Sequence, residues 1–600
     1  MRVADYIAST LANRGVQHVF LVTGGGAMHL NDAFGRSRIE WVPCHHEQAC
    51  AMAAESYYRL SGRLAAVNVT SGPGGINALT GVFGAWTDSL AMIVVSGQVK
   101  NETTVRATGL PLRQLGDQEL DIVRLAAPIT KYAEMVVDPR TIRYHLEKAL
   151  YLATAGRPGP VWLDVPLDVQ AADVDPETLP GFDATAEEER PYTSDVAAAA
   201  REVLARLREA KRPVILAGGG VRISGAHGAF IETIGRLGIP VTTGWNAHDV
   251  IWDDHPLYAG RPGTLGDRAG NFAVQNADFL LVLGSRLNVR QVGYAWKTFA
   301  RAAFTVMVDV DAAEMAKPTV RVDLPVHADL GDFLRAVLSE KYAGPTDAHR
   351  AYVAWCRERR ARYPVVLPEY WAVPAPVNPY CFVDALFRAL PEGEIIVTGD
   401  GTACVCTFQA AVIRLRQRLY TNSGCAAMGY DLPAAIGASF ASGRGRVICL
   451  AGDGSIQMNL QELQTIVTNS LPVKIFVLNN GGYHSIRQTQ AAWFPGNPVG
   501  CDPASRVGFP DFARLSAAYG IPYARISSHA ELAAGIAATV EGPGPRMCEV
   551  MLDPGQPFAP KVASRRLDDG RMVSSPLEDL APFLPREELA SNLLIPPLEE

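Results

Sequence analysis

The stretch that decides the fold is residues 446–480, RVICLAGDGSIQMNLQELQTIVTNSLPVKIFVLNN. Its first apolar run, RVICLA, ends on the turn Gly452-Asp453-Gly454-Ser455, and a helical pattern follows over Gln457–Asn469. The second apolar run, VKIFVL, ends on Asn479-Asn480. Strand, turn, helix and strand in this order predict one right-handed βαβ unit whose polar residues stand at the strand ends.

The ends of these two predicted strands carry the ligand types of a metal and phosphate site. Neighbouring parallel strands bring Asp453 and Asn480 to the same rim of the sheet. A carboxylate, an amide oxygen and a backbone carbonyl, here that of Gly482, suit a hard cation such as Mg²⁺. The small Gly454 and the amides that open the helix suit a phosphate. A diphosphate bridged to the protein by Mg²⁺ satisfies both sets, although GDG and NNGG also occur as ordinary turns.

The composition bounds the class of protein. A chain of 600 residues exceeds one hydrophobic core, so several domains are expected. The net charge of −7 comes without a basic block, which argues against a nucleic-acid partner. No segment has the apolar length of a membrane span, so no membrane association is expected, and the N-terminus is patterned as an amphipathic helix. The ten cysteines are scattered, and we expect reduced thiols in a cytoplasm.

Helix and strand patterns alternate in three blocks, which predicts an α/β fold with three doubly wound parallel sheets. Ala171–Tyr192 is interpreted as the first linker, and Ala343–Asp347 with Tyr363–Pro379 as the second. The predicted domains span residues 1–175, 193–342 and 380–556, and residues 557–600 form a C-terminal tail.

The spacing GDGS(x23)NN resembles the thiamin diphosphate fingerprint, and the chain resembles the acetolactate synthase superfamily over nearly its full length. The resemblance implies a pyrimidine-binding domain, a central FAD-type domain and a diphosphate-binding domain in this order. It also implies thiamin diphosphate and Mg²⁺ as cofactors. The tail is expected to be either a lid over the active site or a disordered end.

The resemblance also implies the catalytic residues. His46-Glu47-Gln48 matches the family motif whose glutamate contacts the aminopyrimidine of the cofactor and activates its carbon nucleophile. Without the family pattern, a glutamate at a helix start is more commonly a favourable dipole contact. Gln118 and His484 are candidate residues of the acceptor pocket, together with Arg487.

Three further motifs match the walls of the cofactor site in the family: TSGPGGIN at residues 70–77, TGDGTA at 398–403 and GCAAMG at 424–429. The last holds a methionine that matches a hydrophobic wedge, although a methionine in an apolar run is usually core filler. The residues that the resemblance assigns to thiamin diphosphate are Thr70, Gly72, Pro73, Asn77, Gly401, Thr402, Ala403, Ala427, Met428, Gly452, Gly454 and Ser455.

The middle block has three polar rims after strands, and a glycine triplet alone is weak support for a nucleotide. By resemblance, this block binds FAD in a non-redox role, although some relatives bind ADP or nothing there. The residues assigned to FAD are Gly218, Gly219, Gly220, Ser285, Arg286, Asn288, Asp309, Val310 and Asp329.

Two positions depart from acetolactate synthase. Asp117 replaces a phenylalanine of the acceptor loop, and Thr489 replaces a tryptophan that follows the NN motif. A more polar acceptor pocket fits a hydroxylated acceptor. Together with the tail sequence MVSSPLED, these positions resemble the yersiniose-type carboligases, which transfer an acetyl unit from pyruvate to the ketone of a nucleotide-linked 4-keto-deoxysugar.

The predicted partners are therefore pyruvate, a ketone acceptor and a second copy of the chain, because in this superfamily two chains share each active site. Two alternatives within the fold are an acetolactate synthase catalytic subunit and a 2-keto acid decarboxylase. A third alternative is a non-catalytic flavin- or sugar-nucleotide-binding module. The presence of Glu47, Asp453 and Asn480 together argues against that module.

Overall fold

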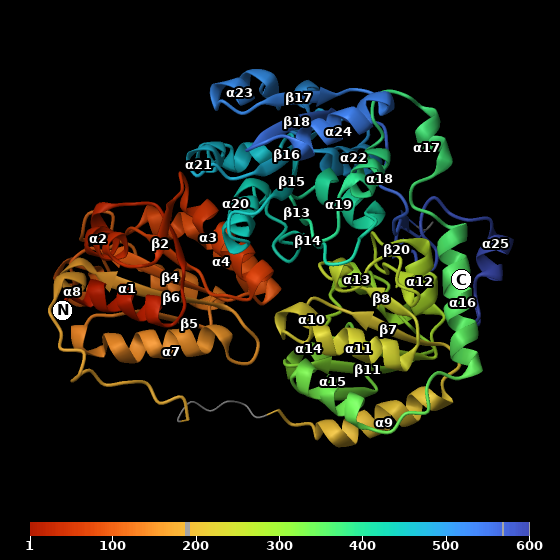
Figure 1. Cartoon of the computed structure of the whole chain (residues 1–600), viewed down its shortest axis with the longest axis horizontal. Coiled ribbons are helices and arrows are strands. Elements are labelled where there is room, and N and C mark those ends of the chain that lie inside the picture. The colour runs from red at the N-terminus through yellow and green to blue at the C-terminus, as the bar shows by residue number, and fades with distance from the viewer. Residues whose placement is uncertain (186–191, 567–568, 599–600) are drawn as a thin grey trace.

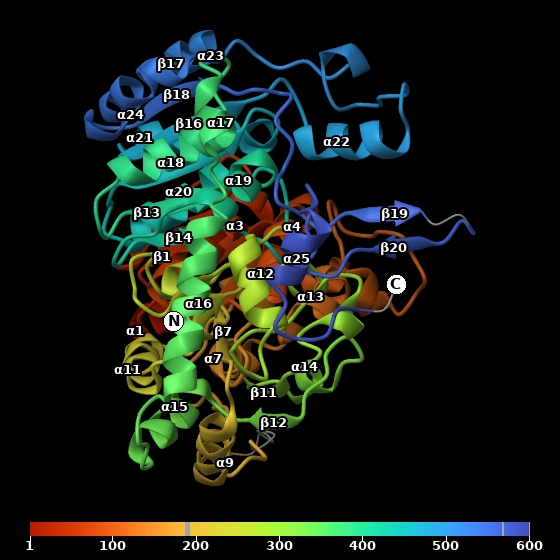
Figure 2. The same ribbon diagram turned by 90° about the vertical axis from the view of Figure 1, so that its right-hand side faces the viewer.

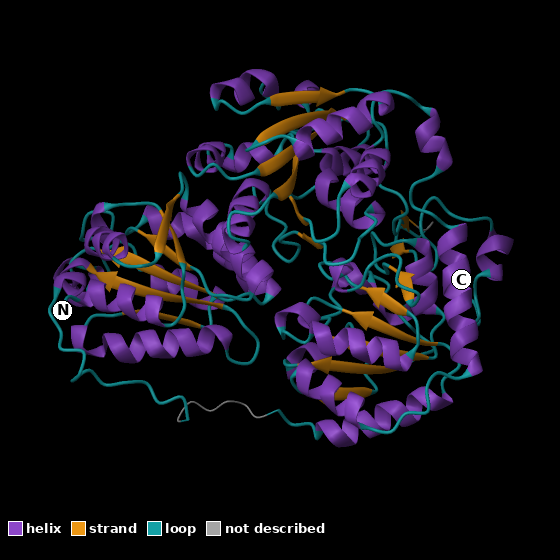
Figure 3. Cartoon of the chain, in the orientation of Figure 1, coloured by secondary structure: helices purple, strands orange, loops and turns teal. Residues whose placement is uncertain are grey.

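The computed structural model describes residues 1–185, 192–566 and 569–598 of the chain. These residues form three units, each built on one six-stranded sheet whose strands all run parallel, with helices on its faces (Figures 1 and 3). The predicted fold class is confirmed. The strands fall inside the predicted domains, whose limits stay a prediction, and residues 186–191 of the first linker lie outside the described residues.

The first unit has the strand order β2-β1-β3-β4-β6-β5. Its strands are β1 (His18–Leu21), β2 (Glu40–Pro43), β3 (Ala66–Val69), β4 (Met92–Gln98), β5 (Tyr132–Met135) and β6 (Pro160–Pro166). Its helices are α1 (Val3–Asn13), α2 (Met28–Arg36), α3 (Glu47–Ser61), α4 (Pro73–Asp88), α5 (Val105–Thr108), α6 (Ile122–Ala126), α7 (Ile142–Thr154) and α8 (Leu167–Ala171). The predicted N-terminal helix is α1.

The central unit has the strand order β12-β11-β10-β7-β8-β9. Its strands are β7 (Pro213–Ala217), β8 (Val241–Thr243), β9 (Tyr258–Gly260), β10 (Phe279–Leu283), β11 (Phe304–Asp309) and β12 (Leu324–His327). Its helices are α9 (Val196–Glu209), α10 (Gly220–Ile223), α11 (His227–Leu237), α12 (Arg268–Gln275), α13 (Val289–Val292), α14 (Ala312–Ala316) and α15 (Leu330–Ser339).

The third unit has the strand order β14-β13-β15-β16-β18-β17. Its strands are β13 (Ile395–Thr398), β14 (Arg418–Tyr420), β15 (Val447–Gly452), β16 (Val473–Asn479), β17 (Tyr523–Ile526) and β18 (Arg546–Met551). Its helices are α18 (Pro379–Ala389), α19 (Thr402–Ala410), α20 (Asp431–Ala441), α21 (Glu462–Thr468), α22 (His484–Trp493), α23 (Phe512–Ala518) and α24 (Leu532–Glu541).

The structure adds or changes detail at three places. The single helix predicted over Gln457–Asn469 is a 3₁₀ turn at Ser455–Asn459 followed by α21, because Asn459 turns inward to donate a 2.7 Å hydrogen bond to the Gly429 carbonyl. The second linker contains helix α17 (Pro368–Ala372), and α16 (Asp347–Arg362) precedes it. The motif TSGPGGIN at residues 70–77 begins with a short glycine-rich turn after β3, and α4 already starts within it at Pro73.

The described part of the tail, residues 557–566 and 569–598, is ordered and is attached to the central unit. It forms the hairpin of β19 (Ser564–Arg566) and β20 (Met572–Ser574), which protrudes from the body in Figure 2, and then helix α25 (Arg586–Ser591). Glu578, buried, accepts hydrogen bonds from Gln275 and from Arg301 at 2.5 and 2.6 Å. The disordered end considered as one alternative is therefore not what the described residues show.

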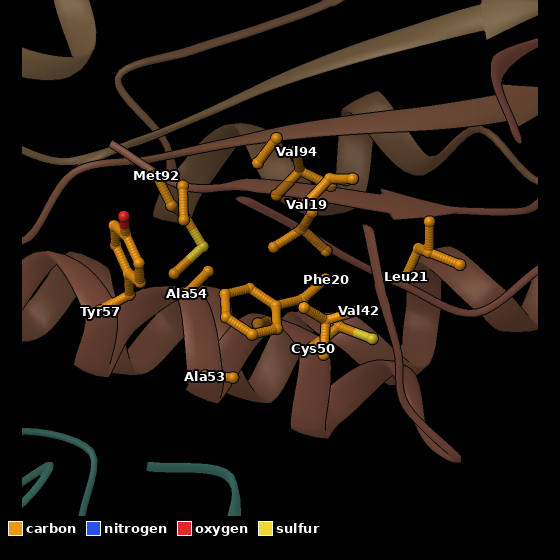
Figure 4. Packing of buried hydrophobic residues seen from close by; sticks show 14 of the residues in the cluster. Val19, Phe20, Leu21, Val42, Cys50, Ala53, Ala54, Tyr57, Met92 and Val94 are labelled. Carbon is orange, nitrogen blue, oxygen red and sulfur yellow. The ribbon is translucent and has the colours of Figure 1, made fainter. Parts of the chain in front are cut away.

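One apolar core runs through the first and third units. Figure 4 shows its part between β1, β4 and α3, where Phe20, Met92 and Tyr57 pack together. The strands read as continuous apolar runs because helices cover both faces of each sheet. The same cluster continues through α20 and β15, so α3 and α20 are neighbours at the junction in Figure 1.

Helices α3 and α20 approach closely because a glycine stands at the contact. A Cβ atom on Gly437 of α20 would lie 2.0 Å from the Ala53 carbonyl oxygen of α3. We expect Gly437→Ala to push the two helices apart and to destabilise the protein by about 1–3 kcal/mol. A fall in the temperature of the first calorimetric unfolding transition checks this.

Gly235 of α11 provides the matched control for this substitution. It also lies within a helix, but nothing stands within 4 Å of a Cβ atom added there. Gly235→Ala is expected to stabilise the protein by about 0.4–1 kcal/mol through the unfolded chain. Equal transition temperatures for the two variants would contradict the close approach of α3 and α20.

Within the described residues, no helix combines the length and the apolar character that crossing a bilayer requires.

Candidate functional site

The carboxyl ends of three neighbouring strands form the rim of the third sheet. Asp400 follows β13, Asp453 follows β15 and Asn480 follows β16. In parallel α/β sheets, ligands bind where the strand order reverses, and here that point lies between β13 and β15. The pairing of Gly452 with Leu478 sets Asp453 opposite Asn479, so Asn480 lies one residue beyond that level at the same rim. The role of Asp453 and Asn480 as metal ligands stays a prediction.

Asp453 is held rigidly at this rim. Its Oδ1 accepts a 2.8 Å hydrogen bond from the Gly454 N–H, and its Oδ2 accepts one of 2.9 Å from the Gly482 N–H. Burial raises the pKa of the Asp453 carboxyl to about 6, against the lowering effect of these N–H donors. The side chain keeps free lone pairs in a buried place that no described cation neutralises by an ion pair, which suits a bound metal ion.

Asn480 supplies the observation that best fits a metal ion. Its Nδ2 donates a 2.8 Å hydrogen bond to Thr402 Oγ1, while its buried Oδ1 has no hydrogen-bond partner among the described residues. An orphaned buried oxygen costs free energy unless a ligand satisfies it. An amide oxygen beside a carboxylate is an oxygen donor set that Mg²⁺ accepts, so the residues fit the group.

Three residues predicted around the diphosphate contribute to the fold as well. The Ser455 hydroxyl donates to Asp431 Oδ2 at 2.6 Å and accepts from the Gly429 N–H at 2.9 Å, so it is engaged within the protein, and its contact with a diphosphate stays a prediction. Gly454 packs under Tyr483, whose ring would lie 2.2 Å from an added Cβ atom. Ala403 is fully buried in α19, where Gly401 is the N-cap residue with φ of 87°.

His484 links the metal loop to the start of the tail. Its Nε2 lies 2.8 Å from the Gln556 carbonyl oxygen, and its ring meets Phe558 edge-on. Burial lowers the pKa of the imidazole. Arg487 of the same helix donates a 3.2 Å hydrogen bond to the Asn480 carbonyl. The structure therefore gives both predicted acceptor-pocket residues of α22 contacts that order this loop.

Glu47 is the first residue of α3 and is half-buried. Asn77 of α4 donates a 3.0 Å hydrogen bond to Glu47 Oε2, so the predicted wall residue orients the predicted catalytic carboxyl. The neighbours of Glu47 reach the third unit: the His45 N–H donates to Glu462 Oε1 at 3.0 Å, and Gln48 Oε1 accepts from Asn459 at 3.2 Å.

The loop that carries Gln118 lies on the glycine-rich turn. The Gln118 carbonyl oxygen would be 2.2 Å from a Cβ atom on Gly72, whose φ is +55°. Gln118 itself has φ of 61°, a conformation that non-glycine residues seldom adopt, and its side chain is exposed. Thr70 accepts a 3.1 Å hydrogen bond from the Gly26 N–H, which closes the turn from the other side.

The predicted site residues thus form two groups. Glu47, Asn77, Gly72 and Gln118 belong to the first unit, and no described hydrogen bond or ion pair joins them to Asp453 at the rim of the third unit. The predicted wedge, Met428, and its neighbour Ala427 lie half-buried in the loop before α20.

A cavity of about 340 Å³ opens where the three units meet, and every residue predicted for FAD lines it. It lies at the strand-order reversal between β7 and β10 of the central sheet. Burial raises the pKa of Asp309 at its edge to about 6. Asn288 and Asp329 also line it, although their carboxamide and carboxylate oxygens cap α13 and α15.

The glycine triplet at this cavity divides into two roles. An added Cβ atom on Gly218 would lie 2.2 Å from the Gly284 carbonyl oxygen, and one on Gly220 would lie 2.7 Å from the Gly284 Cα. Gly219 has nothing nearer than the Asn246 carbonyl oxygen at 3.8 Å. Two glycines therefore allow close backbone packing, and only Gly219 leaves open space for a ligand.

Sequence reasoning missed Arg290, which brings a positive charge from the central unit to the rim of the third. Its guanidinium lies 5.2 Å from the centre of the Trp245 ring, and Trp245 stacks on Phe408 of α19. The charge of Arg290 lowers the pKa of Asp400, which burial raises more strongly. Among the described residues no ion pair or side-chain hydrogen bond engages this guanidinium. Arg290 lies in the segment SRLNVRQ, residues 285–291, which has no recognisable chemical pattern.

Comparisons with known families cover all three units. Residues 1–125 match the thiamine pyrophosphate enzyme N-terminal TPP binding domain, and residues 200–337 match the central domain of the same enzymes. Residues 397–550 match the C-terminal TPP binding domain. The matches follow the order of the three sheets.

Curated proteins align over nearly the whole chain. The acetolactate synthase isozyme 1 large subunit of Escherichia coli is 30% identical over 563 residues, which are 93% of this chain and 95% of that protein. The chloroplastic acetolactate synthase 1 of Zea mays is 32% identical over 94% of this chain and 87% of its own. The acetolactate synthase large subunit of Lactococcus lactis is 30% identical over 93% and 94%, respectively.

Proposed function

The chain belongs to the thiamine pyrophosphate enzyme family and is an enzyme that forms carbon–carbon bonds, and on this premise we propose that it joins a two-carbon unit from pyruvate to a 2-keto acid. The relatives are named acetolactate synthases, which supports a 2-keto acid acceptor better than a nucleotide-sugar acceptor. The observation that carries the proposal is the rim of Asp453 and the unpartnered Asn480 Oδ1.

We infer that Mg²⁺ is held by Asp453, Asn480 Oδ1 and the Gly482 carbonyl, and that it anchors the diphosphate of thiamin diphosphate. The N-terminus of α19, which begins at Thr402 beside Gly401, directs backbone N–H groups toward such an anion. Thr402 also holds the Asn480 amide, so it fixes the oxygen that would face the metal.

In the first unit, Glu47 is proposed to share a proton with the aminopyrimidine ring of the cofactor, and Asn77 keeps the carboxyl in place. When bound, thiamin diphosphate supplies a carbon nucleophile for the keto carbon of pyruvate. The α3 start and the glycine-rich turn would exclude water from the reacting atoms.

The acceptor is proposed to be a 2-keto acid because a guanidinium without a close ion pair stands beside the rim. Among the described residues, Arg290 acts on the Asp400 carboxyl only at longer range and forms no ion pair or side-chain hydrogen bond, and an arginine is the donor best matched to a carboxylate. The nucleotide-sugar acceptor retains one supporting observation: Asp117 and Thr489 are polar and exposed. A 2-keto acid decarboxylase would share the first half of the reaction and release an aldehyde.

The acceptor is tested by product analysis with labelled pyruvate alone, with 2-ketobutyrate and with a nucleotide-linked 4-ketosugar. We expect acetohydroxy acids as products, and we expect Arg290→Gln to raise the KM of the 2-keto acid acceptor about tenfold or more, since it removes a charge-assisted hydrogen bond. Arg38→Gln, on the first unit, is the matched control. Branched-sugar products would show that the acceptor is the nucleotide sugar. Aldehyde alone would show that the protein is a 2-keto acid decarboxylase. Either result would overturn the proposed reaction.

FAD is proposed for the cavity at the three-unit junction. Gly219→Leu is expected to fill the open space beside the ligand and to lower the flavin content of purified protein about tenfold or more. Gly228→Leu on α11, where nothing lies within 4 Å of an added Cβ atom, is the control. Visible flavin absorbance and a cofactor-release assay measure this, and a colourless wild-type protein would refute FAD.

A second copy of the chain is the proposed partner. Helix α4 exposes Ile76, Phe83 and Trp86, which share one face, beside the group around Glu47. An exposed apolar stripe of this kind indicates a protein contact. The proposal that two chains share each active site predicts a dimer or larger assembly in sedimentation velocity, and an active monomer would contradict it.

A further inference from the structure

Asp164 is a buried carboxyl in the middle of the first sheet that the proposed reaction does not use. It lies in β6 between β4 and β5, and its side chain is fully inaccessible. No described lysine or arginine forms an ion pair with it, and the only charge that acts on its pKa is that of Asp121. A carboxyl without a counter-ion in this position costs free energy, so its retention needs a reason.

The carboxyl organises two donors on the neighbouring strand β4. Asp164 Oδ1 accepts a 2.6 Å hydrogen bond from the Ser96 hydroxyl, and Oδ2 accepts one of 3.0 Å from Gln98 Nε2. The Ser96 oxygen in turn accepts from the Trp162 indole N–H at 2.8 Å. Because the indole occupies the Ser96 oxygen as an acceptor, the hydroxyl proton is directed at Asp164.

Gln98 connects Asp164 to the loop that carries Gln118. Its Nε2 also donates a 2.7 Å hydrogen bond to the Leu120 carbonyl, and its Oε1 accepts from the Val99 N–H at 3.1 Å. All three positions of the amide are used. A flipped amide would place its oxygen against both the Leu120 carbonyl and the Asp164 carboxylate, so the carboxylate fixes the orientation that ties Leu120 down.

Leu120 is the point at which the Gln118 loop is anchored to the sheet. The Glu119 carboxylate holds the other end of the loop, because it accepts hydrogen bonds from the Leu115 and Gly116 N–H groups at 2.9 and 3.1 Å. Gln118, between these anchors, has its strained φ of 61° over Gly72. A strained residue persists only where its surroundings over-determine it.

We propose that Asp164 is a positioning residue, which acts through Gln98 and Leu120 to hold the Gln118 loop against the glycine-rich turn of the cofactor site. Its partner in this task is the Gln98 amide, whose described hydrogen bonds join Asp164 of β6, Leu120 of the loop and the adjacent Val99 N–H. The catalytic consequence rests on the role proposed for Gln118, whereas the positioning does not.

The pKa of Asp164 indicates that keeping this carboxyl buried costs folding free energy, as expected of a residue retained for function. Burial raises the pKa to about 7, above the value of an unfolded chain, so the folded protein loses stability as the pH rises from the unfolded pKa to about 7, and the full penalty of the ionised carboxyl remains at higher pH. Replacing it by a neutral amide therefore removes a destabilising charge at pH 8. We expect Asp164→Asn to keep or raise the melting temperature at that pH.

The first test measures hydrogen exchange in the full-length protein, with and without Mg²⁺ and thiamin diphosphate. The asparagine has one acceptor oxygen for the two donors, Ser96 and Gln98, so the anchor is weakened. In Asp164→Asn we expect amides of the peptide 114–122 to exchange about tenfold faster, and β4 and β6 to exchange as in the wild type. Gln98→Met, which cuts the bond to Leu120 directly, should show the same pattern, and the double variant should add nothing further.

The second test separates kcat from KM for pyruvate. A displaced Gln118 is expected to lower kcat about 10- to 100-fold in Asp164→Asn, with KM changed less than about twofold. Asp138→Asn, at the half-buried cap of the 3₁₀ turn Pro139–Thr141 in the same unit, is the control and should change neither the exchange nor kcat.

Unchanged exchange in residues 114–122 overturns the proposal, whatever the activity. Faster exchange throughout the first unit, with a lower melting temperature, also overturns it, because Asp164 would then only support the sheet. Faster exchange confined to the loop with an unchanged kcat supports the positioning and refutes the role of Gln118 instead. The failure of the two ideas is therefore distinguishable.

Discussion

Glu47→Gln is expected to lower kcat for pyruvate turnover about 100- to 10,000-fold, which is the range for loss of a general acid–base group. Glutamine keeps the volume of the side chain and an oxygen for the 3.0 Å bond from Asn77. It cannot share a proton with the aminopyrimidine nitrogen, so the carbon nucleophile would not form at a useful rate. Steady-state turnover and the rate of C2–H exchange of the cofactor, followed by NMR, measure the effect.

The control for this substitution is Glu102→Gln. Glu102 lies in the same unit, is exposed and stands in a 3₁₀ turn away from α3. It should retain wild-type turnover, and both variants should bind thiamin diphosphate with similar affinity because the diphosphate anchor is untouched. If Glu47→Gln left turnover and C2–H exchange at the wild-type level, the assignment of Glu47 would be wrong.

Asp453→Asn is expected to weaken Mg²⁺-dependent binding of thiamin diphosphate about 100-fold or more, equivalent to about 2.7 kcal/mol. The amide has no charge for the metal and one acceptor oxygen for the two N–H groups of Gly454 and Gly482. At a cofactor concentration of about 100 times the wild-type Kd, ligand binding raises stability by about 2.7 kcal/mol, and the variant should lose most of that shift.

Titration calorimetry and thermal unfolding, each with Mg²⁺ and with a chelator, measure this loss. Asp511→Asn serves as the control, since Asp511 is an exposed cap of α23 in the same unit. Its cofactor affinity should equal that of the wild type. A variant at Asp453 that still binds magnesium and diphosphate normally would remove the basis of the proposed site.

The fold was predictable because its signals are local. Each sheet has apolar runs that end on glycine-rich or polar turns, and in each the strand order reverses beside such a turn: Gly24–Gly26, Gly218–Gly220 and Asp400–Thr402. The βαβ unit that holds Asp453 and Asn480 was predicted from spacing alone. The family resemblance added Glu47 and the FAD residues.

What was not predictable depends on contacts between distant segments. The His484 ring meets the Gln556 carbonyl 72 residues away, and the Ser455 hydroxyl donates a hydrogen bond to Asp431. The helix predicted from Gln457 is interrupted because Asn459 bonds to Gly429 and Gln48. Arg290 reaches the rim from another unit, and nothing around it in the sequence announces that position.

The core shared by the first and third units has a consequence for synthesis of the chain on the ribosome. Ser56 of α3 forms a hydrogen bond with Tyr420, 364 residues later. The N-terminal third therefore leaves the ribosome while the face of α3 that packs on the third unit is still uncovered. At typical translation speeds its covering partner appears on the order of 20 to 70 seconds afterwards. During that interval the nascent polypeptide exposes apolar side chains to its neighbours, and we expect its yield in cells to depend on chaperones that shield this face until translation is complete.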